Sequence, residues 1–522
     1  MLVHKESNSL ILKLRDPSRV TNHIPRARVV QYQGMPLTQV FFGLDEARVL
    51  RNLGVPAPSP IRYFYPFPIR PPLKPFDHQV TTAEFFTLNP RCICLNEMGT
   101  GKTISALWAA DYLMDRRIVQ KTIVVCPKST MSAVWEDEVA THMLSKRTVA
   151  VLKGDRARRL KQLARTDVDI YVINHDGLKV IEKELAARKD INLWVIDEAA
   201  KFRNAQSKRH QLLARLVPPT SWMWLLTGTP CPQDPTDAWG LAKLMHGQRV
   251  QPQFFTQFRN QTMLQVTQYK WVPKPDAYTR AYGILQPGIR FKKEDCIDLP
   301  AVTFQTRMST LSPDQIAAYK AMITTFVANV KGVDITAANA AVKMFKLLQV
   351  CVGSVYDEFG QGYDIDSADR LATCEEIVEE AGHKVIVFVP ITHALDKVAA
   401  HLRKRWSVEV VDGRTSDGAR TRIFHDFQHA PDPHIIVAHP ETTAHGLTLT
   451  KADTTIWYAP ITSLETFEQA NNRMNRPGQK NKMTIAMIAA TMLEQNLYQA
   501  LKNKQDVQNA VLSMFKAELG LD

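Results

Sequence analysis

The segment 92-CICLNEMGTGKTISALWAADYLM-114 decides the fold of this chain. An apolar run of strand length ends near Asn96, and a glycine-rich turn follows it. A helical pattern comes next, with apolar residues at Ile104, Leu107 and Trp108 on one helix face. A strand that passes through a tight turn into a helix is the unit from which helix-covered parallel sheets are built. The segment therefore predicts an α/β fold.

The turn has the residues that bound phosphate needs. Gly99 and Gly101 let backbone amides close around an anion. Lys102 would supply a point charge for the β- and γ-phosphates, and Thr103 a hydroxyl for Mg²⁺. The generic pattern has glycine where Asn96 stands, but strand before and helix after favour a phosphate loop over a chance turn. We expect the nucleotide to contact Met98, Gly99, Thr100, Gly101, Lys102 and Thr103.

A second segment, 194-WVIDEAAKFRN-204, ends an apolar run with two adjacent acids. A phosphate loop requires a metal-holding acid on a neighbouring strand, and Asp197 suits that role. Glu198 could orient and deprotonate the attacking water. Such a pair could instead cap the next helix, but the phosphate loop upstream favours catalysis. We therefore predict Thr103 and Asp197 as the Mg²⁺ ligands, with Lys102, Asp197 and Glu198 as catalytic residues.

The composition is that of a soluble globular protein with several domains: 522 residues, 45% hydrophobic and 22% charged. Lysine and arginine total 65 against 52 acids, and the net charge of +13 favours a polyanionic partner such as nucleic acid. Seven scattered cysteines without a Cys-x2-Cys pair argue against a zinc ribbon and fit a reducing cytosol. Neither a signal-peptide pattern nor an apolar run of membrane-spanning length is present. We expect a cytoplasmic protein without a membrane partner.

The hydrophobic pattern divides the chain into four parts. Residues 1–72 hold short alternating segments and end in a proline-rich connector, which predicts a strand-rich accessory module. Residues 73–245 alternate β-branched runs with helical patterns, as expected of a nucleotide-binding α/β lobe. Residues 246–375 predict a helical insertion and linker. Residues 376–522 begin a second alternating series, which predicts a second α/β lobe with a C-terminal helix.

Motifs in a fixed order resemble those of the superfamily 2 helicases, specifically the Swi/Snf group of DNA-dependent ATPases. The resemblance covers residues 73 to 510 and rests on KPFDHQ, NEMGTGKT, VVCPKSTMSAVWEDE, VINHDGL, DEAAKFRN, LLTGTP, IRFKKEDCIDLP, KVIVFVPITHAL, TTAHGLTLTKAD and QANNRMNRPGQ. It implies two RecA-like parallel-sheet lobes in tandem, with ATP and Mg²⁺ bound between the lobes and DNA as the partner. The residues 1–72 and their lead-in resemble the accessory domains of annealing and branch-migrating helicases; a packing module that only stabilises the first lobe is the alternative.

The resemblance also implies roles for single residues. Gln79 would contact the adenine base, and Gln469 would lie near the nucleotide. Arg473 and Arg476 would reach across the cleft to the nucleotide. The residues that would face the DNA backbone are Pro127, Lys128, Ser129, Asn174 and Thr443.

The spacing of Arg473 and Arg476 agrees with this role, because residues i and i+3 share one helix face, here next to a Pro477-Gly478 stop. Two guanidinium groups there could stabilise transition-state charge on a γ-phosphate that another domain presents. The alternative is a solvated basic helix end that interacts with its own dipole.

Two departures from the group's pattern stand out. The group usually has histidine where this chain has Ala200, and that histidine is thought to relay the nucleotide state to other motifs. His445-Gly446-Leu447-Thr448 replaces a more glycine-rich run. The metal and water roles remain intact, but the usual relay is missing.

Four basic clusters, 153–165, 201–210, 290–293 and 472–482, could neutralise phosphates without reading sequence. We expect the first to be an exposed helix face. Trp135 could stack on a base, but it is expected in the core. No helix-turn-helix or zinc finger is visible, so recognition should follow DNA structure, not base sequence.

The sequence thus predicts a monomeric ATP-driven motor on duplex, forked or branched DNA, serving replication, recombination or repair in a bacterial or virus-infected cell. Two alternatives remain open. One is an RNA-directed superfamily 2 helicase. The other, suggested by Ala200, is a nucleotide-gated DNA-binding module without robust hydrolysis.

Overall fold

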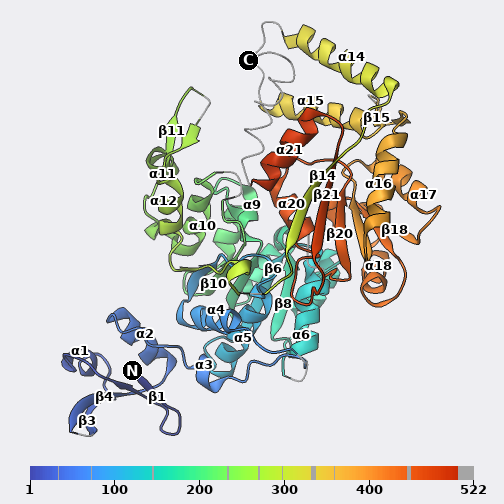
Figure 1. The fold of residues 1–522 in the computed structure, drawn as a ribbon. Helices are drawn as coiled ribbons and strands as arrows, with labels where there is room; N and C mark the ends of the chain where they lie inside the picture. Colours follow the sequence, from blue (N-terminus) through green and yellow to red (C-terminus); the bar gives the residue numbers. More distant parts are fainter. Residues whose placement is uncertain are drawn as a thin grey trace. The chain divides into compact units, whose positions relative to one another are not determined.

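The computed structural model divides the chain into two compact units, Met1–Cys296 and Ile297–Asp522. Each unit is described by itself below (Figure 1). No helix among the described residues is both long and apolar enough to cross a membrane. The residues that the structure describes are 1–32, 34–71, 73–143, 146–231, 234–268, 271–296, 298–330, 337–357, 359–443 and 448–503.

The first unit opens with a small antiparallel sheet of strand order β1-β2-β4-β3. Leu10, Leu12 and Val40 alternate with more exposed residues and point into the core, as the period-two pattern predicts. The strand-rich module expected here is confirmed. Its elements are β1 (Leu2–His4), β2 (Ser9–Leu12), α1 (Ser18–Thr21), β3 (Arg28–Tyr32), β4 (Met35–Phe41), α2 (Leu44–Asn52) and α3 (Ile61–Phe64).

A parallel seven-stranded sheet of order β13-β5-β10-β9-β6-β8-β7 forms the centre of this unit. Its strands are β5 (Arg91–Cys94), β6 (Lys121–Cys126), β7 (Val149–Val151), β8 (Ile170–Asn174), β9 (Ile191–Asp197), β10 (Trp222–Leu226) and β13 (Gly288–Ile289). Along β5, Cys92 and Cys94 join the core on one face, and Ile93 joins the core on the other. Such two-sided burial explains the continuous apolar runs of the strands.

Helices cover both faces of this sheet. Residues of α4 and α5 belong to the core on one face, and residues of α9 and α10 belong to the core on the other. The helices and remaining short elements are α4 (Asp77–Leu88), α5 (Lys102–Asp115), η1 (Met131–Glu136), α6 (Asp137–His142), α7 (Arg156–Leu163), η2 (His175–Val180), α8 (Glu182–Ala187), η3 (Ala199–Phe202), α9 (Lys208–Leu216), α10 (Asp237–His246), η4 (Gly247–Arg249), α11 (Phe255–Thr262), β11 (Met263–Gln265), β12 (Trp271–Pro273), α12 (Ala277–Ile284) and α13 (Lys293–Cys296).

The proline-rich connector packs against α5. The ring of Phe67 meets Trp108 edge to face at 5.3 Å, and the Trp108 indole N–H donates to the carbonyl of Pro68 at 2.8 Å. The Tyr65 hydroxyl donates to the carboxylate of Asp111 at 2.5 Å. The connector is therefore anchored to the helix that follows the phosphate loop.

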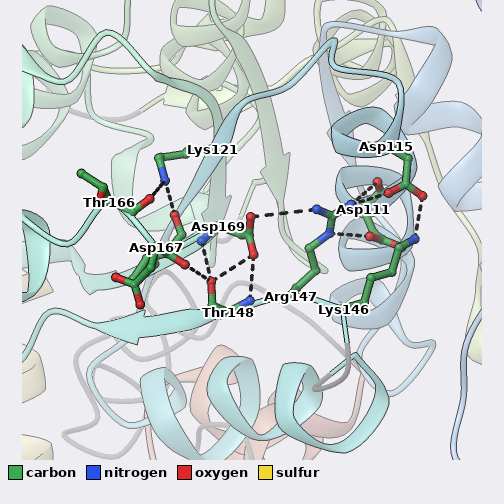
Figure 2. A network of polar contacts seen from close by, with 10 residues as sticks. Asp111, Asp115, Lys121, Lys146, Arg147, Thr148, Thr166, Asp167 and Asp169 are labelled. Carbon is green, nitrogen blue, oxygen red and sulfur yellow. Dashed lines mark hydrogen bonds and ion pairs between the residues drawn. The ribbon is translucent and has the colours of Figure 1, made fainter.

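A network of ion pairs around Asp111 also holds α5 in place (Figure 2). Its buried carboxylate accepts hydrogen bonds from Lys146 at 2.7 Å and from Arg147 at 2.5 Å. Both cations also bind Asp115, one helical turn further on. Arg147 precedes Thr148, whose amide donates to Asp169 at 2.8 Å. The network therefore joins α5 to the segments that carry β7 and β8.

The second unit is built on a parallel six-stranded sheet of order β14-β21-β20-β17-β19-β18. Its strands are β14 (Val302–Met308), β17 (Lys384–Phe388), β18 (Val408–Val411), β19 (Ile435–Ala438), β20 (Ala452–Trp457) and β21 (Met483–Ala489). β14 lies within the span 246–375 and forms the edge next to β21. Two parallel sheets in tandem, preceded by a strand-rich module, confirm the predicted fold class.

Helices again lie on both faces of this sheet. Residues of α16 and α17 belong to the core on one face, and residues of α15, α18, α20 and α21 to the core on the other. The remaining elements are α14 (Pro313–Val330), α15 (Ala337–Cys351), β15 (Ser354–Tyr356), β16 (Gly362–Asp364), α16 (Ala368–Glu380), α17 (Thr392–Leu402), α18 (Asp417–His429), α19 (Pro440–Thr443), α20 (Leu464–Asn471) and α21 (Met492–Lys502).

Candidate nucleotide-binding site

The glycine-rich turn links β5 to the N-terminus of α5, as the sequence indicates. Gly99 and Gly101 have φ angles of +82° and +83°, in the left-handed region that favours glycine. A Cβ atom on Gly101 would lie 2.1 Å from Nε2 of Gln79. The turn is thus a narrow cradle of backbone at a helix N-terminus, which is the geometry that binds phosphate.

Lys102 is the first residue of α5, and its side chain turns back into this cradle. Its Nζ atom donates to the carbonyls of Asn96 at 2.8 Å and Glu97 at 3.1 Å. The ammonium group therefore lies across the loop that a phosphate chain would enter. Thr103, the next residue of the helix, is half-buried. An ammonium, a hydroxyl and helix-terminal amides at one turn fit a nucleotide phosphate with Mg²⁺.

Gln79 lies in the first turn of α4 and is buried beside the loop. Its side-chain oxygen accepts from the amide of Phe76 at 3.1 Å, and its Nε2 lies 3.5 Å from the carbonyl of Thr100. The imidazole of His78 donates to the same carbonyl at 2.8 Å. Burial lowers the pKa of His78, which favours the neutral ring. The structure thus brings the predicted base-contacting residue against the phosphate loop.

Asp197 ends β9, where two side chains and one amide hold it. Its Oδ2 accepts from the indole N–H of Trp135 at 3.0 Å, and its Oδ1 accepts from the amide of Glu198 at 3.0 Å. Its backbone carbonyl accepts from Nε2 of His175 at 2.9 Å. Burial raises the pKa of Asp197, and the nearby charge of Lys102 opposes this rise. The predicted metal ligand is therefore a partly buried, oriented carboxylate close to the phosphate loop.

The environment of Asp197 contains two residues whose roles the sequence did not indicate. Trp135 is 1% exposed, which confirms it as a core residue and excludes the stacking on a base. Burial lowers the pKa of His175 to about 4, so its imidazole is neutral near pH 7. A buried indole N–H usually has a hydrogen-bond acceptor. The sequence could therefore have predicted that Trp135 has an acceptor, but not which residue provides it. The acceptor itself lies 62 residues away.

Ala200 occupies the position where the group usually has histidine. It is buried in η3, two residues before Phe202. The ring of His175 meets Phe202 edge to face at 5.2 Å and 87°. A histidine from another segment therefore contacts both the carbonyl of Asp197 and the turn that carries Ala200.

The residues expected to face DNA in this unit follow the carboxyl ends of strands. Pro127, Lys128 and Ser129 follow β6; Lys128 is exposed and Ser129 half-buried. Asn174 ends β8, and its side-chain oxygen accepts from Arg159 at 3.1 Å. Because the strands are parallel, these residues, Asp197 and the phosphate loop share one edge of the sheet.

Arg159 belongs to α7, within the first basic cluster. Arg156 and Arg158 of this helix are exposed, which agrees with the expected exposed face. Arg159 instead turns inward, toward Asn174 and the carbonyls of Leu152 and Gly154.

In the second unit, Gln469 and Arg473 are buried. Gln469 donates to Glu465 at 3.0 Å, and Nε of Arg473 donates to the carbonyl of Gln469 at 3.0 Å. Arg476 donates to Thr448 Oγ1 at 3.1 Å. Thr443 is the last residue of α19, and the altered motif at His445–Leu447 lies outside the described residues.

The expectation that Arg473 and Arg476 share a helix face is wrong. Helix α20 ends at Asn471, and both arginines lie in the turns that follow it. The carbonyl of Arg473 accepts from the amide of Leu449 at 2.9 Å, a contact with a distant segment in place of one within the helix. Pro477 has no amide N–H, so this carbonyl could not accept a helical hydrogen bond from residue 477 in any case.

Known protein families and relatives match most of the chain. The family model described as SNF2-related domain matches residues 25–353, and the model described as helicase conserved C-terminal domain matches residues 369–478. The putative protein p41 of Acyrthosiphon pisum secondary endosymbiont phage 1 is 23% identical over 80% of this chain and 94% of its own length.

Larger proteins match over part of their length. The mouse chromodomain-helicase-DNA-binding protein 1-like is 27% identical over 81% of this chain, which spans only 48% of that relative.

The SWI2/SNF2 ATPase core of Sulfolobus solfataricus, solved in complex with dsDNA, is 21% identical over 86% of this chain and 95% of its own, with a TM-score of 0.40. The SNF2-related match alone covers more than half of the sequence. The chain therefore belongs to the SNF2-related family, a group of DNA-dependent ATPases within superfamily 2.

Proposed function

We propose that the chain is an ATP-driven translocase or helicase that acts on duplex, forked or branched DNA. The observation that carries this proposal is the shared edge of the first sheet. The phosphate loop, the acid pair and the turns after β6 and β8 all lie at that edge. A nucleotide and a DNA backbone bound there would contact the ends of neighbouring strands.

In the proposed hydrolysis, different residues bind the phosphates, the base, the metal ion and the attacking water. Lys102 and the loop amides bind the phosphates, and Gln79 contacts the base. Thr103 and Asp197 would hold Mg²⁺, which supplies charge neutralisation for the β- and γ-phosphates when bound. Glu198, whose amide donates to the carboxylate of Asp197, would take a proton from the attacking water.

The second unit would complete the site. We propose that Arg473 and Arg476 meet the γ-phosphate when the two lobes close, with Gln469 beside them. A planar guanidinium presents several N–H donors at once, which suits the charge that develops on transferring phosphoryl oxygens. Closure that depends on ATP, followed by opening after hydrolysis, would move one lobe along the DNA.

DNA binding would follow the shape and charge of the backbone. Lys128 supplies a cation and Pro127, Ser129, Asn174 and Thr443 supply turn contacts, in a chain of net charge +13. We propose residues 1–72 as an accessory module, 73–245 and 376–522 as the lobes and 246–375 as insertion and linker. We further propose that the chain acts as a monomer in replication, recombination or repair, in the cytoplasm of a bacterial or infected cell. The match to a phage protein over 94% of its length supports only the setting in a bacterial or infected cell.

An ATPase assay tests the proposal directly. Phosphate release would be measured without nucleic acid and with single-stranded, duplex, forked and four-way DNA and duplex RNA. We expect the strongest stimulation by duplex or branched DNA. Equal stimulation by RNA would favour the RNA-directed alternative. ATP-sensitive DNA binding without phosphate release would favour the nucleotide-gated module. Lys102→Ala serves as the inactive control.

A further inference from the structure

The indole of Trp135 forms a side-chain contact with the acid pair that no local pattern predicts. Its N–H donates to Oδ2 of Asp197 at 3.0 Å, and the ring is 1% exposed. An indole has one polar atom, a donor. The single hydrogen bond that this side chain can donate is therefore made to the predicted metal ligand.

The backbone around Trp135 is unusual. Met131–Glu136 forms a π-helix, η1, which leads directly into α6. π-Helical turns are rare and occur frequently at functional sites. This turn follows Pro127, whose carbonyl accepts from both the amide and the hydroxyl of Thr130, at 3.1 and 3.0 Å. Trp135 thus projects from a segment tied to the end of β6.

The contacts around Asp197 fix both of its carboxylate oxygens. Trp135 binds Oδ2, and the amide of Glu198 binds Oδ1. Each carboxylate oxygen has two lone-pair directions, so a cation can still approach an oriented oxygen. Groups that orient a metal ligand in this way commonly change metal affinity by about 10- to 100-fold when removed.

We propose that Trp135 is a positioning residue that holds the carboxylate of Asp197 for Mg²⁺-nucleotide and links it to the DNA-facing segment after β6. The link to DNA rests on the proposed function. Ser129 and Trp135 belong to the same short segment, so a DNA backbone seated on Ser129 would shift the indole against Asp197. The orientation of the carboxylate would then depend on DNA.

The test compares two buried tryptophans. Trp135→Phe removes the N–H donor and keeps an aromatic ring. Trp194→Phe is the matched control, because Trp194 is 2% exposed in β9 and its indole N–H has no hydrogen-bond partner among the described residues. The readout is the affinity for a fluorescent ADP analogue, measured in Mg²⁺ and in EDTA. The ratio of the two affinities reports the metal ligand without requiring turnover.

We expect Trp135→Phe to reduce the gain in affinity due to Mg²⁺ by about 10-fold and to leave the affinity in EDTA unchanged. Trp194→Phe should change neither. An unchanged Mg²⁺ gain in Trp135→Phe, or an equal loss in both variants, would overturn the positioning role. Trp135→His, which keeps a ring N–H, should restore most of the gain. If Trp135→Phe does not fold, Trp135→His still tests the proposal. A folded Trp135→His variant whose nucleotide affinity does not rise with Mg²⁺ would contradict the positioning role.

A second arm separates the link to DNA from the positioning role. The ratio of DNA-stimulated to basal ATPase should fall in Trp135→Phe and stay the same in Trp194→Phe. A reduced Mg²⁺ gain with an unchanged ratio would overturn the link and leave the positioning role standing. A wild-type chain that DNA does not stimulate would contradict the proposed function, and the nucleotide-binding arm would still decide the role of Trp135.

Discussion

The side-chain oxygen of Asn96 accepts a hydrogen bond from the amide of Phe291 at 3.0 Å, across 195 residues of sequence. Its Nδ2 donates to the hydroxyl of Thr82 at 2.9 Å. The next residue, Glu97, donates its amide to the carbonyl of Phe291 and accepts from the amide of Lys293, both at 3.0 Å. The start of the phosphate loop is thereby fastened to α4 and to the segment that ends the first unit. A glycine at position 96 could not form the two side-chain bonds.

Replacing Asn96 tests this fastening. Asn96→Ala removes a buried side chain and leaves the amide of Phe291 without its acceptor, and we expect the free energy of unfolding to fall by about 2 kcal/mol. Urea unfolding followed by circular dichroism would measure the change. Asn52→Ala, at an exposed asparagine of α2, is the control and should have little effect. Equal stability of the two variants would contradict a structural role for Asn96.

The cradle at Gly101 predicts an effect on base selection. Gly101→Ala places a Cβ atom at φ +83° and against Nε2 of Gln79, so the glutamine must move. We expect a loss of about 1 kcal/mol in stability and a smaller preference for ATP over GTP in binding. Gly283→Ala in α12 has open space around its Cβ and ordinary φ, so it should leave the nucleotide preference unchanged and should not lower stability. Unaltered nucleotide preference in Gly101→Ala would argue against base contact by Gln79.

Glu198→Gln should separate binding from turnover. The change removes the proposed base for water and keeps the carboxylate of Asp197. We expect ATP and DNA affinities near those of the wild type and a turnover reduced by about 10²- to 10⁴-fold. Single-turnover phosphate release and nucleotide titration would measure the two effects. Glu182→Gln, at a surface glutamate of α8, is the control. Turnover within a few-fold of wild type would disprove the proposed role.

The network in Figure 2 predicts a contrast between a buried and an exposed acid. Asp111→Asn removes a carboxylate that is 1% exposed and leaves Lys146 and Arg147 with less compensation. We expect a loss of about 3 kcal/mol in the free energy of unfolding. Asp167→Asn breaks only the exposed pair with Arg165 and should have no measurable effect. Denaturant unfolding of both variants in parallel would check the difference.

His175 predicts how stability depends on pH in the absence of nucleotide. Its pKa is lowered to about 4 by burial, whereas an unfolded histidine titrates near pH 6.5. Between these values the unfolded chain binds a proton that the folded chain does not. The contribution of neutral His175 to the free energy of unfolding is therefore present above about pH 6.5. It is lost progressively as the pH falls toward 4, by at most about 3 kcal/mol.

Unfolding curves at several pH values between 4.5 and 7.5 would show this slope. His175→Gln should flatten it, because glutamine keeps a donor for the carbonyl of Asp197 and does not titrate. His23→Gln, at an exposed histidine, should leave the slope unchanged. A wild-type slope in His175→Gln would assign the pH dependence to other groups.

Much of the fold followed from local patterns, because the central strands of both parallel sheets are buried on both faces. The β-branched runs expected within residues 73–245 are found as β6, β8, β9 and β10. β14 was not predicted, because its alternating and largely exposed residues mark an edge strand within an irregular region. The end of α20 was missed because the sequence places a stop only at Pro477-Gly478, whereas the helix ends six residues earlier, at Asn471.

The sequence alone determined the chemistry of the candidate site. Lys102, Thr103, Asp197 and Glu198 follow strands, and parallel strands bring their carboxyl ends to one edge whatever their order. The tertiary structure alone decided which side chains hold these groups. Trp135 and His175 contact Asp197 from 62 and 22 residues away in sequence. Trp135 follows β6 and His175 follows β8, and the sheet order β9-β6-β8 places the ends of these strands near the end of β9. Strand order depends on long-range packing, and local sequence patterns do not encode it.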